Sequence, residues 1–560
     1  MEILQRGTRQ EDHRVGVSMR FGSCEEAKRC AKALLYAKDI HTRFPEKVRD
    51  EAKKFEDMTV SEEDCKGRMD LRALPIFTID SAETKDIDDA VSLTRLPGGG
   101  YELGVHIADV SHYVKPGSEL NEEAFNRATS VYYADQVVPM LPKSLSNGIC
   151  SLNEKELRLA FSCLMRLDQD GNLTDYKFVK SIICSRVKGV YSEINALLAG
   201  TADAETQAKY AEVLDQLPAM KELYAHRARL RKERGCIDFE SGEVKLILDE
   251  NGHCIDVKKR TSGESEAMIE EFMLLANRRV AEFCGKRRTE SGRSAERTMV
   301  YRVHDTPSEE KLDRFRQFIL RFGHIFKATK GRAVAKELNK LFKQIKGTTE
   351  ENAVATMAVR SMAKAYYTTD NIGHYGLAFP YYTHFTSPIR RYPDMMVHRL
   401  LARYLAGGKP ADKTELEDLC ARASDREVVA AEAERASIKY KMVEFMKEHI
   451  GEEFEGHISG LTEWGVYVEL DETHIEGMSF LRDIEGDFFT FDEQLYEIIG
   501  RSTGIRMTLG SPVRIRVKRA DLQKRQLDFE LLLPGAAARR TEEPRGKGPK
   551  VRTSSRRKGR

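Results

Sequence analysis

The sequence predicts an α+β protein in which a mixed body of strands and helices is followed by a small β-barrel. Strand-like segments come first and long helical patterns follow them, whereas short β-type runs return after residue 450. The chain has 560 residues, which exceeds the size of a single hydrophobic core and suggests about three or four units.

The composition is typical of a globular protein with a highly charged surface, since 41% of the residues are hydrophobic and 32% are charged. No stretch approaches the roughly 18 uninterrupted apolar residues of a membrane helix, so we expect no membrane partner. Residues 1–22 lack the apolar core of a signal peptide, and the ten cysteines show no C-x-x-C spacing. We therefore expect a cytoplasmic protein whose cysteines are reduced.

Charge is distributed unevenly along the chain. The whole chain carries +2, but residues 535–560 hold ten Lys/Arg and two Glu, which makes this tail +8 and the remainder −6. A protein that binds nucleic acid through a uniformly basic surface is therefore excluded, and any such binding must use local patches. The tail has almost no apolar residues, so residues 534–560 are predicted to be disordered.

Residues 1–55 are predicted to form a short leading segment that is too small for a core of its own. Ser23 and Glu26 make a capping box for one helix, and a second helix is expected between Pro45 and Phe55. Five strands follow, and turns at 97–100 and 170–172 join two pairs of them. These strands are expected at 74–80, 90–96, 101–110, 160–167 and 176–187.

Helical patterns dominate residues 204–449. The expected helices span 204–233, 265–283, 309–322, 350–367, 394–404 and 414–449. Five short strands are then expected within about 80 residues, which is typical of an OB-type barrel. They span 453–459, 465–470, 477–480, 512–519 and 526–532.

The most informative segment is TIDSAETKDIDDA at 78–90, because it gathers acidic side chains between two strands. Asp80 ends one strand, and Asp86, Asp88 and Asp89 precede the next. Asp86 and Asp88 share one face of an extended chain whereas Asp89 faces away. A turn is therefore needed to bring all four carboxylates together.

Four adjacent carboxylates repel each other and take up protons unless a cation compensates their charge. Mg²⁺ prefers octahedral oxygen ligands, and two such ions can activate a water and stabilise a leaving oxygen at a phosphodiester. The segment has no nearby set of His and Cys that would suggest a redox metal. On spacing alone, a solvated acidic loop is an equally good interpretation.

Further motifs lie on both sides of this acidic segment. They are VHIADVS at 105–111, RATSVY at 127–132, VPMLP at 138–142 and YTHFTSPIRRYPD at 382–394. With these motifs the chain resembles the RNB catalytic domain of the ribonuclease R and ribonuclease II family. The resemblance implies a processive 3′→5′ hydrolytic exoribonuclease that degrades single-stranded RNA to nucleoside 5′-monophosphates. It also implies that the four aspartates bind Mg²⁺, with two ions expected.

The resemblance assigns roles to individual residues. It places Arg390 at the catalytic centre, where a planar guanidinium can grip a phosphate, so Asp88 and Arg390 are the candidate catalytic residues. Aromatic contacts suit an enzyme that ignores base sequence, because every base has a π face. The implied RNA contacts are Tyr132 at the 3′-terminal nucleotide, Tyr191 and Phe239 along the channel, and His384, Ser387 and Glu434 near the centre.

Several of these residues have an alternative interpretation. Tyr132, Tyr191 and Phe239 could be core residues, and His384 and Ser387 could serve packing. Glu434 lies in a charged helical pattern and could face solvent. Arg391 is expected to pair with a carboxylate, and the motif residues His106 and Asp109 are expected to be structural because they face opposite sides of a strand.

Residues 451–533 resemble an S1 RNA-binding domain, most clearly in GHISGLTEWGVYV at 456–468. Trp464 and Tyr467 match positions at which this fold places stacking aromatics. Phe480 stands where many S1 domains have histidine, so the role of that position stays open. Four basic residues on a late strand could contact phosphates: Arg514, Arg516, Lys518 and Arg519.

The resemblance also divides the chain into four parts. Residues 1–55 match a remnant of an N-terminal cold-shock or OB domain, 56–450 the RNB catalytic domain, 451–533 the S1 domain and 534–560 a disordered basic tail. Family members usually carry two cold-shock domains before the catalytic domain. We therefore expect that the chain is truncated or that its true start lies upstream, which would impair RNA loading.

The basic tail is more typical of ribonuclease R than of ribonuclease II. It implies activity on structured RNA as well as on single strands, and weak affinity for ribosomes. We expect a monomer. The competing hypothesis is a catalytically silent RNB protein that only binds RNA, but such a protein would be expected to have lost some of the four aspartates.

Overall fold

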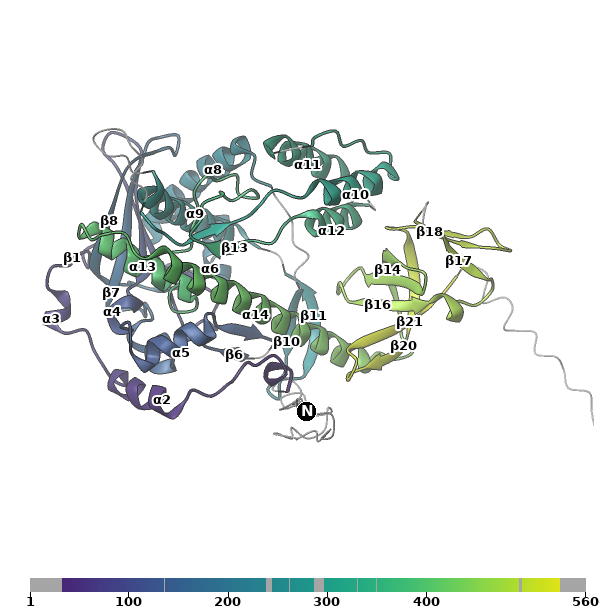
Figure 1. Cartoon of the computed structure of the whole chain (residues 1–560), viewed down its shortest axis with the longest axis horizontal. Helices are drawn as coiled ribbons and strands as arrows, with labels where there is room; N and C mark the ends of the chain where they lie inside the picture. Colours follow the sequence, from purple (N-terminus) through teal and green to yellow (C-terminus); the bar gives the residue numbers. More distant parts are fainter. Residues whose placement is uncertain are drawn as a thin grey trace, which may run out of the picture. The chain divides into compact units, whose positions relative to one another are not determined.

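The structure is a computed structural model that describes residues 33–134, 136–237, 244–260, 262–286, 297–329, 331–348, 350–492 and 496–533 (Figure 1). Packing divides the chain into two units, residues 1–445 and 446–560. In the part of the chain that is described, no helix is both long and apolar enough to cross a membrane. Of the helix predicted behind Ser23, the structure describes only residues 33–36, which are helical.

A five-stranded sheet with the order β1-β8-β7-β4-β3 lies in the first unit. Its strands are β1 (Met69–Asp70), β3 (Asp89–Arg95), β4 (Tyr101–Ala108), β7 (Leu157–Leu167) and β8 (Leu173–Cys184). All neighbouring strands are antiparallel except β1 and β8, which are parallel. The two hairpins predicted around turns 97–100 and 170–172 are therefore confirmed.

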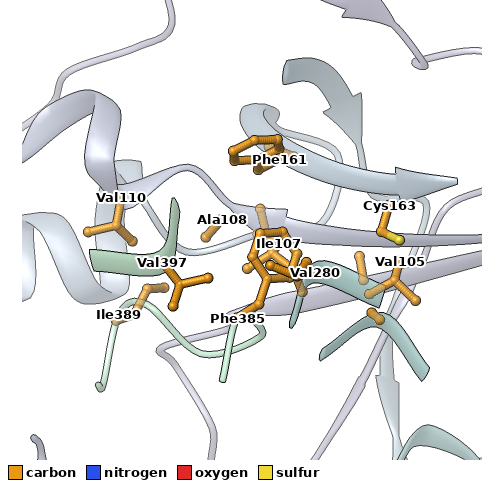
Figure 2. Close-up of a cluster of buried hydrophobic side chains, with 14 of the residues drawn as sticks. Val105, Ile107, Ala108, Val110, Phe161, Cys163, Val280, Phe385, Ile389 and Val397 are labelled. Atoms are coloured by element: carbon orange, nitrogen blue, oxygen red, sulfur yellow. The ribbon is translucent and has the colours of Figure 1, made fainter. Parts of the chain in front are cut away.

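The core packs against this sheet (Figure 2). Val105 and Ile107 of β4 alternate onto one face, where they are fully buried together with Phe161 of β7. Val280 of helix α9 (Glu264–Gly285) and Phe385, which precedes helix α13 (Tyr392–Leu405), complete the same cluster. The core therefore ties the segment before α13 to the strands that lie near the acidic loop.

The first unit also contains helices of very different lengths. They are α2 (Glu46–Ala52), α3 (Glu62–Cys65), α4 (Val110–Tyr113), α5 (Glu119–Arg127), α6 (Tyr191–Ala199), α7 (Ala204–Lys209), α8 (Leu217–Arg234), α9 (Glu264–Gly285), α10 (Glu309–Leu320), α11 (Gly331–Ile345), α12 (Glu351–Ser361), α13 (Tyr392–Leu405) and α14 (Lys413–Lys447). Helices predicted at 265–283, 309–322, 394–404 and 414–449 are confirmed as α9, α10, α13 and α14.

Two helix predictions were wrong in extent. The segment 204–233 is not one helix, because α7 ends at Lys209 and α8 begins only at Leu217. Pro218 lies in the first turn of α8, where its missing N–H costs nothing. The helix predicted at 350–367 ends at Ser361 instead. Tyr367 belongs to strand β13 (Tyr366–Thr368), which pairs with β12 (Tyr301–Val303). Helix α11 had not been predicted.

Three short strand pairs complete the first unit. Strand β2 (Thr78–Asp80) is parallel to β9 (Lys188–Val190), so the strand predicted at 74–80 is confirmed only at its end. The other pairs are antiparallel: β5 (Val131–Tyr133) with β6 (Gln136–Val138), and β10 (Val244–Leu248) with β11 (Cys254–Lys259). Val131 and Val138 pack on Ala433 of α14, which places β5 and β6 beside that helix.

The second unit contains a closed five-stranded barrel, as predicted. Its strands, in barrel order, are β14 (Glu453–Leu461), β15 (Gly465–Leu470), β16 (Glu476–Phe480), β21 (Gln526–Leu531) and β20 (Pro512–Asp521). A three-stranded sheet that had not been predicted lies between β16 and β20 in the chain. It consists of β17 (Phe489–Asp492), β18 (Glu497–Gly500) and β19 (Arg506–Met507).

Candidate active site

The four aspartates lie where β2 ends and β3 begins. Asp80 is the last residue of β2 and Asp89 is the first residue of β3. The loop between them turns back through a hydrogen bond of 3.1 Å from Thr84 N–H to Ser81 O. The turn that the spacing required is therefore present, and the carboxylates of Asp86 and Asp89 act electrostatically on both Asp80 and Asp88.

The second half of the acidic loop is anchored by Ser151, which is fully buried. Its Oγ accepts from Ile87 N–H at 3.0 Å and donates to Lys85 O at 2.8 Å. The backbone of Asp88 is held as well, because Ala108 N–H donates to its carbonyl at 2.9 Å. These bonds fix the directions in which Asp86 and Asp88 leave the backbone.

Asp88 is only 4% exposed and connects the acidic loop to the segment before α13. Its Oδ1 accepts a hydrogen bond of 2.7 Å from Ile389 N–H. Its Oδ2 lies 3.8 Å from Arg390 Nε. Burial raises the pKa of Asp88 well above its ordinary value, and Arg390 opposes that shift.

The electrostatics of the cluster favour a cation. Burial and the nearby Asp89 raise the pKa of Asp80 to about 8. Burial raises the pKa of Asp89 to about 6 against the opposing pull of Arg390 and Arg391. Because burial and like charge both disfavour the ionised forms, a bound divalent cation would stabilise them.

The donor set also fits a hard divalent metal. Within the described residues, the buried Oδ2 atoms of Asp80 and Asp88 have no hydrogen-bond partner. In the same part of the chain, no group of three or more His, Cys, Asp or Glu side chains is already arranged to hold an ion. The argument for a metal site therefore depends on the oxygen donors and on the unpaired buried atoms among them. It does not depend on side chains that already surround an ion.

Arg390 is positioned through its backbone. Ser130 N–H donates to Arg390 O at 2.9 Å, and Thr129 Oγ1 donates to the same carbonyl at 3.2 Å. Tyr392 N–H donates to Ala128 O at 2.9 Å, which extends the contact. The segment that leads into β5 is thus tied to the segment that leads into α13.

The side chains of this second segment form a small network. Asp394 is fully buried, and its Oδ1 accepts from Ser387 N–H and from Arg391 Nη2, both at 2.8 Å. The expectation that Arg391 pairs with a carboxylate is confirmed. Arg390 Nη2 donates to Ser387 Oγ at 3.2 Å while its side chain stays 42% exposed. Arg390 is therefore held at one end and remains accessible to a ligand.

Two tyrosines border the acidic cluster. Tyr132 of β5 donates from its hydroxyl to Asp86 Oδ2 at 3.3 Å. Tyr191 begins α6 directly after β9, and burial together with Asp89 and Asp80 raises its pKa. Tyr191 therefore lies close to the acids, as Tyr132 does. The contact of both tyrosines with RNA stays a prediction.

The remaining predicted contacts are less closely associated with the cluster. His384 Nδ1 lies 2.8 Å from Tyr367 Oη, and burial lowers the pKa of His384 well below its usual range. Glu434 lies on α14, where Ser437 Oγ donates to its carbonyl, and its role stays a prediction. Phe239 lies outside the described residues.

The aromatic residues predicted in the barrel belong to the second unit. Trp464 lies in the turn between β14 and β15 and is 70% exposed, as a stacking residue requires. Tyr467 lies on β15, where it pairs with Gly460 of β14. Their contact with RNA stays a prediction.

The two motif residues expected to be structural are deeply buried. His106 is fully buried, and its ring lies 3.0 Å from Ser92 Oγ and 2.7 Å from Ser162 Oγ. Asp109 accepts from Arg68 at 2.8 Å and from Lys180 at 2.6 Å. These bonds confirm the structural interpretation of both residues.

Three residues that position the site had not been predicted. Asp394 ends the motif at 382–394, but its bond to a backbone N–H group, like that of Ser151, depends on the fold. Lys188 donates to backbone carbonyls of the acidic loop. Because every residue has a backbone carbonyl, the residue types in the sequence do not indicate this contact.

Known proteins are similar to this chain over most of its length. The family model of the RNB domain matches residues 68–407. The chain is 41% identical to ribonuclease R 1 of Lactococcus lactis over 93% of its own length and 64% of that protein, and 40% identical to ribonuclease R of Thermotoga maritima over 87% and 68%. A solved structure of Mycoplasma genitalium RNase R, in complex with ribose-methylated single-stranded RNA, has a TM-score of 0.83 at 28% identity and covers 91% of this chain and 79% of that one.

The family match covers the acidic loop, both tyrosines and Arg390. The relatives named ribonuclease R extend the similarity over most of this chain, although the chain spans only about two thirds of their length. The chain therefore belongs to the RNB family, and within it to the ribonuclease R group.

Proposed function

We propose that this chain is a 3′→5′ exoribonuclease that hydrolyses single-stranded RNA and releases nucleoside 5′-monophosphates. The observation that carries the proposal is the group of four aspartates, one buried and three half-buried, beside the accessible Arg390. The names of the relatives support the reaction class. The single-stranded RNA bound to the M. genitalium protein supports the substrate class.

We propose Mg²⁺ as the metal, with two ions, held by Asp80, Asp86, Asp88 and Asp89. When bound, magnesium supplies an activated water and stabilises the charge on the leaving 3′-oxygen. The unpaired buried oxygens of Asp80 and Asp88 support this assignment, because buried carboxylates are costly without a partner.

Arg390 would bind the scissile phosphate. Its guanidinium has several N–H donors in a plane, and only one of them is used by Ser387 Oγ. Arg390 lies close to Asp88, so its positive charge would be next to a phosphate bound at the acids. There it would stabilise the negative charge that the phosphate gains in the transition state. Asp88 would keep its place through the bond to Ile389 N–H.

Tyr132 and Tyr191 would hold the RNA end. Tyr132 donates to Asp86, so its ring is fixed beside the acidic cluster and can pack on the 3′-terminal nucleotide. Tyr191 approaches from α6 on the side of Asp80 and Asp89. Stacking of this kind is worth roughly 1–3 kcal/mol per base and does not depend on sequence.

The catalytically silent alternative is not favoured. A silent member would be expected to lack part of the acidic set or Arg390, whereas all five residues are present. The proposed partners beyond RNA are ribosomes, through the +8 tail, since basic tails bind polyanions weakly and in a salt-sensitive way. We expect the activity in the cytoplasm and from a monomer.

The test uses a 5′-labelled, unstructured RNA a few tens of nucleotides long, incubated with the protein and either Mg²⁺ or EDTA. On a denaturing gel, direct conversion of full-length RNA to a very short labelled product, only with Mg²⁺, is the expected result. Intact RNA that still shifts on a native gel would contradict the proposal and favour the RNA-binding alternative.

A further inference from the structure

Lys188 is the first residue of β9. This strand pairs with β2, whose last residue is Asp80. The register aligns Lys188 with Thr78 and Val190 with Asp80. The backbone N–H of Lys188 donates to Glu154 Oε2 at 2.8 Å, which fixes the start of the strand. The side chain is half-buried and leaves the strand toward the loop that follows Asp80.

The ammonium group of Lys188 joins two carbonyls of that loop. Its Nζ donates to Ala82 O at 3.0 Å and to Thr84 O at 2.6 Å. Among the described residues, no other side chain donates to either carbonyl. Lys188 is therefore the side-chain anchor of the first half of the loop, as Ser151 is of the second half.

The two anchors act on opposite sides of the gap between Asp80 and Asp86. Ser151 holds residues 85–87, while residues 81–83 are exposed and have little packing of their own. Without the bonds from Lys188, the loop between the two acids would be fixed mainly by one backbone bond, Thr84 N–H to Ser81 O. The separation of Asp80 and Asp86 thus depends on Lys188.

The charge of Lys188 points to the same role. Lys188 and Arg390 are the cations whose charge favours the ionised form of Asp80. Arg390 is exposed and is the residue that would bind a phosphate. Lys188 is engaged with the loop itself, so its charge stays beside the acids whether or not RNA is bound.

We propose that Lys188 is a positioning residue that closes the loop 81–85 and so holds Asp80 and Asp86 ready to bind the same divalent cations. This inference rests on the proposed function only in its assumption that the four aspartates bind metal. Groups that orient metal ligands without touching the metal are worth about 10- to 100-fold in metal affinity or activity.

The experiment compares three substitutions of Lys188 with a matched control. Lys188→Met removes the charge and the donors, Lys188→Gln keeps donors without charge, and Lys188→Arg keeps both. Lys413→Met is the control, because Lys413 pairs with the exposed Asp370 at 2.5 Å and lies outside the site. Calorimetric titration with Mn²⁺ and thermal unfolding in EDTA are measured for each full-length variant.

Lys188→Met is expected to weaken Mn²⁺ binding about 10- to 100-fold, while RNA binding in EDTA is unchanged. Lys188→Arg is expected to restore most of the affinity, with Lys188→Gln between the two. In hydrolysis assays, the Mg²⁺ concentration for half-maximal rate should rise in the same order. If Lys188→Met unfolds in EDTA at the control's temperature, its loss of Mn²⁺ affinity cannot be attributed to lost folding.

The inference is overturned if Lys188→Met and Lys413→Met bind Mn²⁺ as the wild type does, or if Lys188→Arg is as weak as Lys188→Met. If Lys188→Met does not fold, Lys188→Gln is compared with Lys188→Arg instead. Weaker Mn²⁺ binding by Lys188→Gln than by Lys188→Arg supports the inference, and equally weak binding by both overturns it. A wild-type protein that binds Mn²⁺ but leaves RNA intact would contradict the proposed function alone. A wild-type protein that hydrolyses RNA while all Lys188 variants bind Mn²⁺ equally would contradict only this inference.

Discussion

Asp88 combines three constraints on a single side chain: nearly complete burial, a backbone hydrogen bond from Ile389, and the neighbouring Arg390. An amide in its place keeps a carbonyl oxygen that can accept from Ile389 N–H, so the local fold is retained. The same amide has no negative charge for a cation. Asp88 therefore allows metal binding and RNA binding to be separated.

We expect Asp88→Asn to lower the rate of RNA hydrolysis at least about 100-fold, since even residues outside the ligand set contribute about 10- to 100-fold. RNA affinity in EDTA should be unchanged, as measured by fluorescence anisotropy. Glu83→Gln is the control, because Glu83 is exposed in the same loop and its substitution by glutamine removes the same charge. Equal losses in the two variants would show that only the net charge of the loop matters.

His106 is a fully buried residue whose ring is enclosed by serine hydroxyls rather than acids. Burial lowers its pKa to about 3, from an ordinary value near 6.5. Between these two pH values the unfolded chain binds a proton that the folded protein does not bind. The stability contributed by neutral His106 is therefore complete above about pH 6.5 and decreases as the pH falls.

We predict that the stability advantage of the wild type over His106→Gln is largest near neutral pH. It should fall by up to about 1.4 kcal/mol per pH unit below about pH 6. Urea denaturation in EDTA at several pH values measures this difference, and the titration of other groups cancels between the two proteins. A difference that is constant from neutral to acidic pH would contradict the neutral, buried state.

At the scale of elements, the segment before α13 depends on Asp394 in the first turn of that helix. Its carboxylate accepts from Ser387 N–H and from Arg391, and it is fully buried. Removing it would leave a partly buried guanidinium without its partner and a backbone donor unpaired. The same segment carries Arg390, so its order affects the site directly.

We expect Asp394→Ala to destabilise the fold by about 2–4 kcal/mol, since a buried charge loses its partner and a buried N–H its acceptor. Asp394→Asn should cost less, because it keeps an acceptor for Ser387 N–H. Chemical denaturation measures both. Equal stability of Asp394→Ala and the wild type would mean that the network does not hold the segment.

Most elements could be predicted from the sequence because their signals are local. The hairpin of β3 and β4 has a Pro-Gly turn between alternating apolar residues, and α9 follows a clear apolar stripe. The error at 350–367 arose because long-range pairing decided the outcome. Tyr367 continues a helical pattern in sequence, but β13 forms because β12 is available as a partner.

At the scale of the whole molecule, the four aspartates could be predicted because they lie within ten residues of each other, in motifs that resemble one family. The residues that position them could not. The positioning side chains bind backbone groups: Ser151 binds Ile87, Lys188 binds Thr84 and Asp394 binds Ser387. Every residue has the same backbone groups, so the residue types in the sequence do not indicate these partners. Only the fold brings these segments together.

The uneven charge of the molecule leads to a further prediction. Deleting residues 534–560 removes ten Lys/Arg, so the dependence of RNA affinity on salt should become weaker. Each cation that no longer contacts a phosphate should lower the slope of log K against log salt by about 0.7 for single strands. Filter binding at several salt concentrations measures the slope, and an unchanged slope would exclude the tail from RNA contact.

The bond between Ile389 and Asp88 spans 301 positions of the chain. At a typical synthesis rate of about 5–20 residues per second, the first aspartates therefore leave the ribosome roughly fifteen seconds to a minute before their partners exist. A nascent chain cannot assemble the proposed site during that interval. The topology thus delays the proposed nuclease activity until the segment that carries Ile389 and Arg390 has been synthesised.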